Sequence, residues 1–128
     1  MLLVAEDNNN WIYSCVINDD GSLKYKERWY WLHPTDNFGY SQVGNIAMDN
    51  QGNLYAATNL GVQICDQNGR VRAILQIPGG PITGLCFGGS NFETLYVVCG
   101  GKLFKRKLKV NGVPAWAAPV HPQATGAG

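Results

Sequence analysis

The chain has 128 residues, of which 45% are apolar and 15% are charged, and its formal net charge is +1. This balance excludes a disordered chain, and it lacks the basic surface that a nucleic-acid partner requires. No stretch approaches the roughly 20 apolar residues of a membrane helix, so we expect no membrane partner. The segment Met1–Ala5 is too short for a signal peptide, so the compartment stays unknown and cytoplasmic only by default.

Short strands joined by tight turns are predicted along the whole chain. The 16 glycines and the β-branched and aromatic residues favour such strands, and no segment has the pattern of a helix. Turns are indicated by Asp19-Asp20-Gly21 and by Asn68-Gly69, a strong hairpin signal. In chain order we expect about ten strands: Leu2–Ala5, Trp11–Cys15, Lys24–Trp31, Asn45–Met48, Asn53–Thr58, Gly61–Cys65, Val71–Ile77, Ile82–Phe87, Thr94–Cys99 and Lys102–Val110.

Repetition organises these strands into units. The segments Leu2–Ala5, Leu54–Ala57 and Leu95–Val98 match when stacked, and their starts differ by 52 and 41 residues. A period of about 40–50 residues built from short strands is typical of β-propeller blades, which are four-stranded antiparallel sheets. We therefore predict an all-β fold, a partial propeller of about two and a half blades. The propeller covers residues 1–112, and a Pro/Ala/Gly-rich tail covers 113–128. The propeller contains an incomplete first blade without its inner strand (1–40), a complete blade (41–80) and a third blade without its outer strand (81–112).

Four cysteines lie in these strands, at positions 15, 65, 86 and 99. None belongs to a C-x-x-C pair, so a zinc site is not expected. Each stands among apolar residues, which favours buried free thiols. A disulfide would require export, which the sequence does not show.

Two segments carry a resemblance to a known family. The run Ala47–Arg70, and Cys86-Phe87-Gly88-Gly89 followed by Thr94-Leu95-Tyr96-Val97, resemble the C-terminal portion of the SMP-30/gluconolactonase/LRE-like family. The resemblance covers roughly residues 41–110, and the opening segment fits more loosely. It implies a six-bladed ring that hydrolyses sugar lactones or related esters. It also implies one divalent metal, calcium or zinc, on the ring axis, where it polarises the lactone carbonyl and activates water.

The metal-ligand positions of that family transfer poorly to this chain. Two ligands, an acid near the N-terminus and an Asn before the opening blade, have no counterpart here. A third, an Asp five residues before the position of Asp49, is Gly44, which has no side chain. Asn45 is the next residue and could supply an oxygen. Asp7 matches an Asp after the family's second strand and either points toward the axis or caps a turn. We therefore expect no bound metal or cofactor in this chain, with Asp7 and Asn45 the only candidate site residues.

Other polar and aromatic residues have plainer interpretations. His33 lies in a loop that could line a pocket mouth or be an ordinary surface loop, and His121 lies in the tail. The basic run Lys102–Lys109 has Lys105, Lys107 and Lys109 on one face, which favours a solvated edge over a polyanion site. The aromatic triplet Trp29–Trp31 either stacks on a sugar ring or packs against a neighbouring blade.

Two functional hypotheses follow, with different partners. The chain is either part of a lactonase-like hydrolase, inactive alone, or a non-catalytic binding or scaffold propeller that has lost the metal site. An open stretch of blades leaves sheet faces uncovered, so we expect self-association or docking on a missing N-terminal half, and a sugar lactone as the small ligand. The residues expected on the uncovered faces are Leu3, Ile12, Val16, Val97, Phe104 and Leu108.

Overall fold

Three antiparallel sheets make up the computed structural model, which describes residues 1–36, 39 and 41–114. The first sheet contains β1 (Leu2–Ala5), β2 (Trp11–Ile17) and β3 (Leu23–Trp31). The second contains β4 (Ile46–Met48), β5 (Leu54–Thr58), β6 (Gly61–Cys65) and β7 (Val71–Leu75). The third contains β8 (Ile82–Gly88), β9 (Thr94–Cys99) and β10 (Lys102–Lys107).

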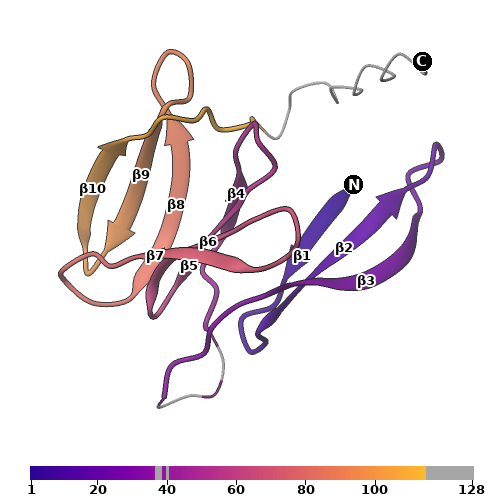
Figure 1. Cartoon of the computed structure of the whole chain (residues 1–128), viewed down its shortest axis with the longest axis horizontal. Coiled ribbons are helices and arrows are strands. Elements are labelled where there is room, and N and C mark those ends of the chain that lie inside the picture. Colours follow the sequence, from indigo (N-terminus) through magenta and orange to yellow (C-terminus); the bar gives the residue numbers. More distant parts are fainter. Residues whose placement is uncertain (37–38, 40, 115–128) are drawn as a thin grey trace.

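Within each sheet, strands that follow one another in sequence pair with one another, and the three sheets stand side by side in chain order (Figure 1). This is the predicted all-β, partial-propeller fold, and the described residues form ten strands in groups of three, four and three. The described residues contain no helix long and apolar enough to cross a membrane.

The middle sheet is covered on both faces, and its strand β5 shows how the core is built. All five residues from Leu54 to Thr58 are buried. Because successive strand residues point to opposite faces, Leu54 and Ala56 pack toward the first sheet, and Tyr55 and Ala57 toward the third. Two apolar clusters therefore hold the fold together, one between each pair of neighbouring sheets.

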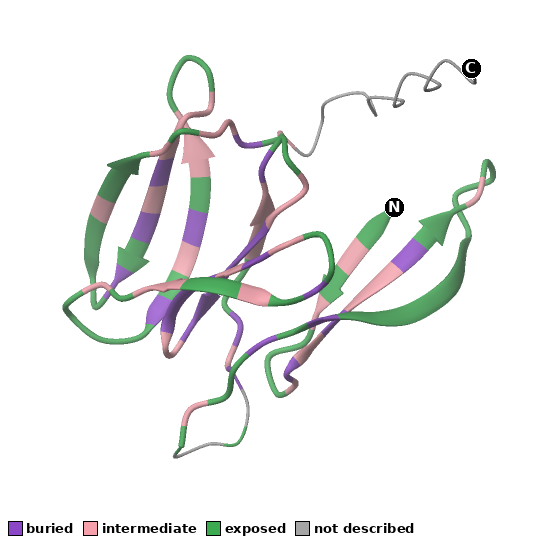
Figure 2. Cartoon of the chain, in the orientation of Figure 1, coloured by how far each residue is buried: buried purple, intermediate pink, exposed green. Residues whose placement is uncertain are grey.

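The outer faces of the terminal sheets are open to solvent, as the green segments of Figure 2 show. The prediction of which residues lie on these open faces was mostly wrong. Ile12 and Val97 are buried, and Leu3, Phe104 and Leu108 pack against the two clusters; only Val16 is exposed. Because alternation has a period of two, neighbours of those residues are exposed instead: Leu2 and Val4 on the first sheet, and Val98 and Leu103 on the third.

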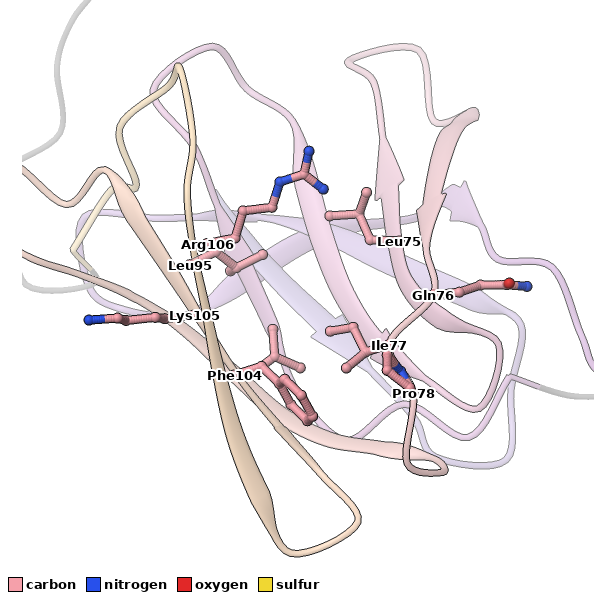
Figure 3. A pocket seen from close by; sticks show the side chains of 9 residues that line it. Leu75, Gln76, Ile77, Pro78, Leu95, Phe104, Lys105 and Arg106 are labelled. Carbon is pink, nitrogen blue, oxygen red and sulfur yellow. The ribbon is translucent and has the colours of Figure 1, made fainter.

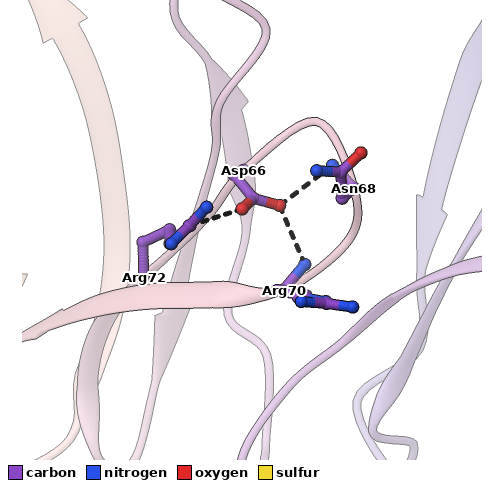
Figure 4. A network of polar contacts seen from close by, with 4 residues as sticks. All are labelled: Asp66, Asn68, Arg70 and Arg72. Atoms are coloured by element: carbon purple, nitrogen blue, oxygen red, sulfur yellow. Dashed lines mark hydrogen bonds and ion pairs between the residues drawn. The ribbon is translucent and has the colours of Figure 1, made fainter.

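The turn between β6 and β7 joins the second sheet to the first. Asp66 accepts hydrogen bonds from the Arg72 side chain and from the Arg70 and Asn68 amides, and these bonds hold the pKa of its carboxyl below the usual range (Figure 4). The turn then contacts β3, where Gly69 O accepts from the Trp31 amide and Gln67 O from the Trp29 indole. A Cβ at Gly69 would lie 2.0 Å from Trp29 O, so only glycine permits this approach.

The chain leaves the third sheet after Lys107 and crosses to the second. We call residues 108–113 the strap. β10 ends at Lys107, earlier than the predicted Val110, although the Leu108 amide still donates to Glu93 O in register with the ladder between β9 and β10. Further along, the Gly112 amide donates to Phe92 O and the Val113 amide to Met48 O, and Asp49 bridges to Gly112. The strap therefore ties the third sheet to β4 and does not add a fourth strand beside β10. The tail from 115 to 128, with His121, lies outside the described residues.

All four cysteines are free thiols, as expected. Cys15, Cys65 and Cys99 are buried, but Cys86 is exposed because it faces outward on β8. Burial raises the pKa of the Cys65 thiol to about 12, with a smaller contribution from the Asp66 charge.

Candidate functional site

One end of the three sheets gathers the sequence-predicted site residues. In antiparallel sheets successive connections lie at opposite ends, so residues 6–10, 32–36, 41–45 and 76–81 lie at the lower end of Figure 1. Asp7, His33, Gly44 and Asn45 all belong to these loops. This end is therefore the part of the fold where a ligand site is to be sought.

Asn45 is held against the third sheet. Its Nδ2 donates to Leu85 O (2.7 Å), and its Oδ1 accepts from the Leu85 amide (2.7 Å). One amide side chain thus pairs with both backbone groups of one residue in β8, as a neighbouring strand would. The oxygen that could have served a metal ion is engaged in this clamp.

Gly44 lies against the backbone of the same strand. A Cβ built there would stand 2.3 Å from Thr83 O and 2.8 Å from Thr83 C, distances that real Cβ atoms do not show. An aspartate at this position would therefore require β4 and β8 to move apart. The absence of a side chain at Gly44 matches the close approach of the two inner strands.

Asp7 is exposed in the loop between β1 and β2. Turn capping there belongs to another residue, since Asn9 Oδ1 accepts from the Trp11 amide (3.0 Å) and the Asn9 amide donates to Glu6 O (3.3 Å). Among the described residues the Asp7 carboxylate has no hydrogen bond or ion pair. Its role as a turn cap is therefore not supported, and its role as a ligand lacks converging partners.

A buried polar network links the first two sheets at this end, and sequence reasoning missed it. Gln63 is fully buried, and its Oε1 accepts from the His33 amide (2.8 Å), while its Nε2 donates to His33 O (2.9 Å) and to Thr58 Oγ1 (3.1 Å). The Ser41 hydroxyl donates to Asn10 Oδ1 (2.8 Å) and lies 3.2 Å from His33 O. The one signal was Gln63 itself, a polar residue inside the apolar strand Gly61–Cys65.

This network fixes the course of the loop that carries His33, whose side chain is exposed. Asn10 extends the same network by donating to Gly39 O (2.8 Å). The aromatic triplet does not act as one unit: Tyr30 is buried between the first two sheets, whereas Trp31 is exposed and packs edge-on against Trp11 of its own sheet, with ring centroids 4.9 Å apart. Packing against the neighbouring sheet therefore holds for Tyr30 and for Trp29, whose indole donates to Gln67 O, but not for Trp31.

The acids of the described residues do not converge on one point. Asp49 is buried, but its two oxygens already accept from the Gln51 and Asn53 amides, from Asn53 Nδ2 and from the Tyr55 hydroxyl. The described part of the chain holds no group of three or more His, Cys, Asp or Glu side chains able to bind a metal ion. With the Asn45 amide engaged and Gly44 without a side chain, these residues do not fit the divalent metal that the resemblance implies.

The arrangement of three stacked antiparallel sheets defines the class of the protein as a partial β-propeller fold. The family model for the SMP-30/gluconolactonase/LRE-like region matches residues 1–100, and the chain belongs to this family. No curated protein sequence matches it.

Two solved structures are similar in fold. An X-ray structure named "putative gluconolactonase" has a TM-score of 0.74 at 21% identity, over 88% of this chain and 36% of that chain. The luciferin-regenerating enzyme has a TM-score of 0.71 at 17% identity, over 87% of this chain and 42% of that chain. At these identities the likeness shows the fold alone. The chain spans well under half the length of either solved protein.

Proposed function

We propose that this chain forms one wall of a lactone-hydrolysing propeller and that it does not hydrolyse lactones by itself. The clamp between Asn45 and Leu85 carries the proposal, because it commits the only candidate ligand on the inner strand to a structural contact. The family match and the length of the solved relatives support a larger ring in which other residues supply the chemistry.

The substrate class proposed for the larger ring is a sugar lactone or a related ester. The support is the family and the fold shared with a "putative gluconolactonase". In that ring, residues 6–10, 32–36, 41–45 and 76–81 would border the mouth of the site, with the Gln63 network holding His33 in place. Calcium or zinc, if the ring uses it, would depend on residues other than those described here.

A non-catalytic binding or scaffold propeller is the second candidate. The observation that favours it is Gly44, where the close approach of Thr83 leaves no space for the family's aspartate. The two candidates differ in what the longest natural polypeptide containing this sequence does with a lactone.

The first experiment follows proton release from glucono-1,5-lactone in the presence of the 128-residue chain with calcium, with zinc or with a chelator. We expect rates equal to spontaneous hydrolysis in all three cases, and no tight calcium or zinc binding by calorimetry. Metal-dependent turnover that disappears in a folded Asn45→Ala variant would overturn the proposal that the chain is inactive alone.

The second experiment applies the same assay to the longest natural polypeptide that contains the sequence. Metal-dependent lactone hydrolysis by that polypeptide supports the hydrolase candidate. A folded, full-length protein without turnover on several lactones and esters supports the non-catalytic candidate.

A further inference from the structure

The third sheet lacks the strand that completes the second. In the second sheet β7 pairs with β6, and its residue Leu75 packs against the cluster shared with the third sheet. In the third sheet β10 is the last strand, because the strap turns away at Leu108. The position beside β10 is therefore not filled by any described residue of the chain.

The backbone groups on the open edge of β10 can be assigned from the pairing. Leu85 gives its amide and carbonyl to Asn45, so these groups point away from β9, and the Leu85–Val97 pair is not hydrogen-bonded. Val97 then bonds to its partner Phe104 on the other side. Because the pattern alternates, the amides and carbonyls of Leu103, Lys105 and Lys107 point away from β9, toward the open edge of the sheet.

Beside this edge the fold has an apolar groove of about 190 Å³. Figure 3 shows Phe104 and Leu95 on one side of it and Leu75 and Ile77 on the other. Phe104 belongs to β10 itself, so a strand added at the edge would have its own side chains on the Phe104 face directed to this groove.

The same edge is strongly basic. Four of the six residues of β10 are cations, at positions 102, 105, 106 and 107. Of these four cations only Lys107 has an ion pair among the described residues, with Glu93 at 3.5 Å. Lys105 and Lys107 share the outer face of the strand. An added strand would therefore be favoured if it carried carboxylates on that face.

We propose that β10 accepts an extended segment in which apolar residues alternate with carboxylates, and that this segment becomes the fourth strand of the third sheet. The open backbone groups give the pairing, the groove takes the apolar residues, and the lysines select the acids. The sequence of residues 115–128 contains no acidic residue, so it does not match this pattern.

The test uses two labelled synthetic peptides, Glu-Val-Glu-Ile-Glu-Val-Glu and Lys-Val-Lys-Ile-Lys-Val-Lys, with binding to the 128-residue chain followed by fluorescence anisotropy. We expect the acidic peptide to bind at least tenfold more tightly than the basic one and to weaken with salt. Hydrogen exchange should slow at the amides of Leu103, Lys105 and Lys107.

Two variants locate the binding. Lys105→Glu should weaken binding of the acidic peptide severalfold, whereas Lys24→Glu, an exposed lysine of β3, should leave it unchanged. Leu103→Pro removes one outward amide without breaking the β9–β10 ladder and should also weaken binding. Equal binding of both peptides, no binding, or protection elsewhere would overturn the proposal. So would concentration-dependent protection of the same amides without peptide, which would make a second copy the occupant.

Discussion

Where neighbouring sheets meet, two amide side chains make the paired hydrogen bonds to backbone groups that an adjacent strand would otherwise make. Sheets of a propeller contact face to face, so no backbone ladder crosses from one to the next. Asn45 pairs with both backbone groups of Leu85, and Gln63 pairs with both backbone groups of His33. A neutral carboxamide suits this role because it carries a donor and an acceptor in one plane.

Removing the Asn45 clamp should lower stability. Asn45→Ala loses two hydrogen bonds to Leu85, which is buried, and we expect the free energy of unfolding to fall by about 1–2 kcal/mol. Asn45→Asp should lower the free energy of unfolding by a similar amount, because an ionised carboxylate cannot donate to Leu85 O. Urea unfolding measures both. Asn68→Ala is the control, since its side chain makes no described hydrogen bond; an Asn45→Ala change no larger than the control would contradict the structural role.

At the scale of elements, the strap closes one end of the junction between the second and third sheets. It passes close to β8: a Cβ at Gly112 would lie 2.2–2.5 Å from the nearest three atoms of the Phe87 side chain. Its amides bond to Phe92 and Met48, which belong to different sheets or their turns. The strap therefore acts as a tie between the two sheets.

Gly112→Ala should loosen this tie. The added methyl must displace Phe87 or lift the strap, at an expected cost of about 1–3 kcal/mol in the free energy of unfolding. Hydrogen exchange should become faster at the amides of Gly112 and Val113. Gly84→Ala is the matched control, because a Cβ there meets only Asn45 Oδ1 at 3.8 Å. Unchanged stability and unchanged exchange in Gly112→Ala would show that the strap contributes little.

At the scale of the molecule, a thiol and two tyrosine hydroxyls with raised pKa values predict a loss of stability at alkaline pH. Burial raises the pKa of Cys65 from 9.0 to about 12, and it is also the main cause of the raised pKa values of Tyr30 and Tyr55. Their protonated forms are favoured in the folded state. Stability is therefore fully present below about pH 9 and falls as the pH rises toward 12, because the unfolded state releases these protons first.

Urea midpoints at pH 7, 9 and 10.5 should show a level region followed by a decline. Cys65→Ala should lower stability at every pH, because it leaves a cavity, and should make the alkaline decline shallower. A decline of the same steepness in Cys65→Ala would contradict the assignment of this thiol.

The open outer faces predict association of the isolated chain. Val98 and Leu103 are neighbours across β9 and β10, with 41% and 67% of their surfaces exposed, and both lie on the outer face of the third sheet. Sedimentation at micromolar concentration should show species larger than 14.0 kDa, with binding of a hydrophobic dye. The double variant Val98→Thr/Leu103→Thr should reduce both the association and the dye binding, whereas Thr94→Ser on the same face should change neither. A single sharp monomer of the unmodified chain would show that this expectation is wrong.

The sequence by itself determined the strands and their grouping. Repeated apolar runs separated by turn residues such as Asn68-Gly69 depend on local chemistry, so the ten strands, and three of them to the residue, were predictable. Asp49 lies in a turn of the same local kind, where its carboxylate accepts from the amides of Gln51 and Asn53. The family also followed from such local runs.

Only the tertiary structure decided which face of each terminal strand is covered and what the polar residues do. Alternation gives two faces but not which one meets a neighbour, so Ile12 and Val97 were assigned to the wrong side. Asn45 and Leu85 are 40 residues apart, and Gln63 and His33 are 30 apart. Their pairing depends on how one sheet is placed against the next, which no local pattern encodes.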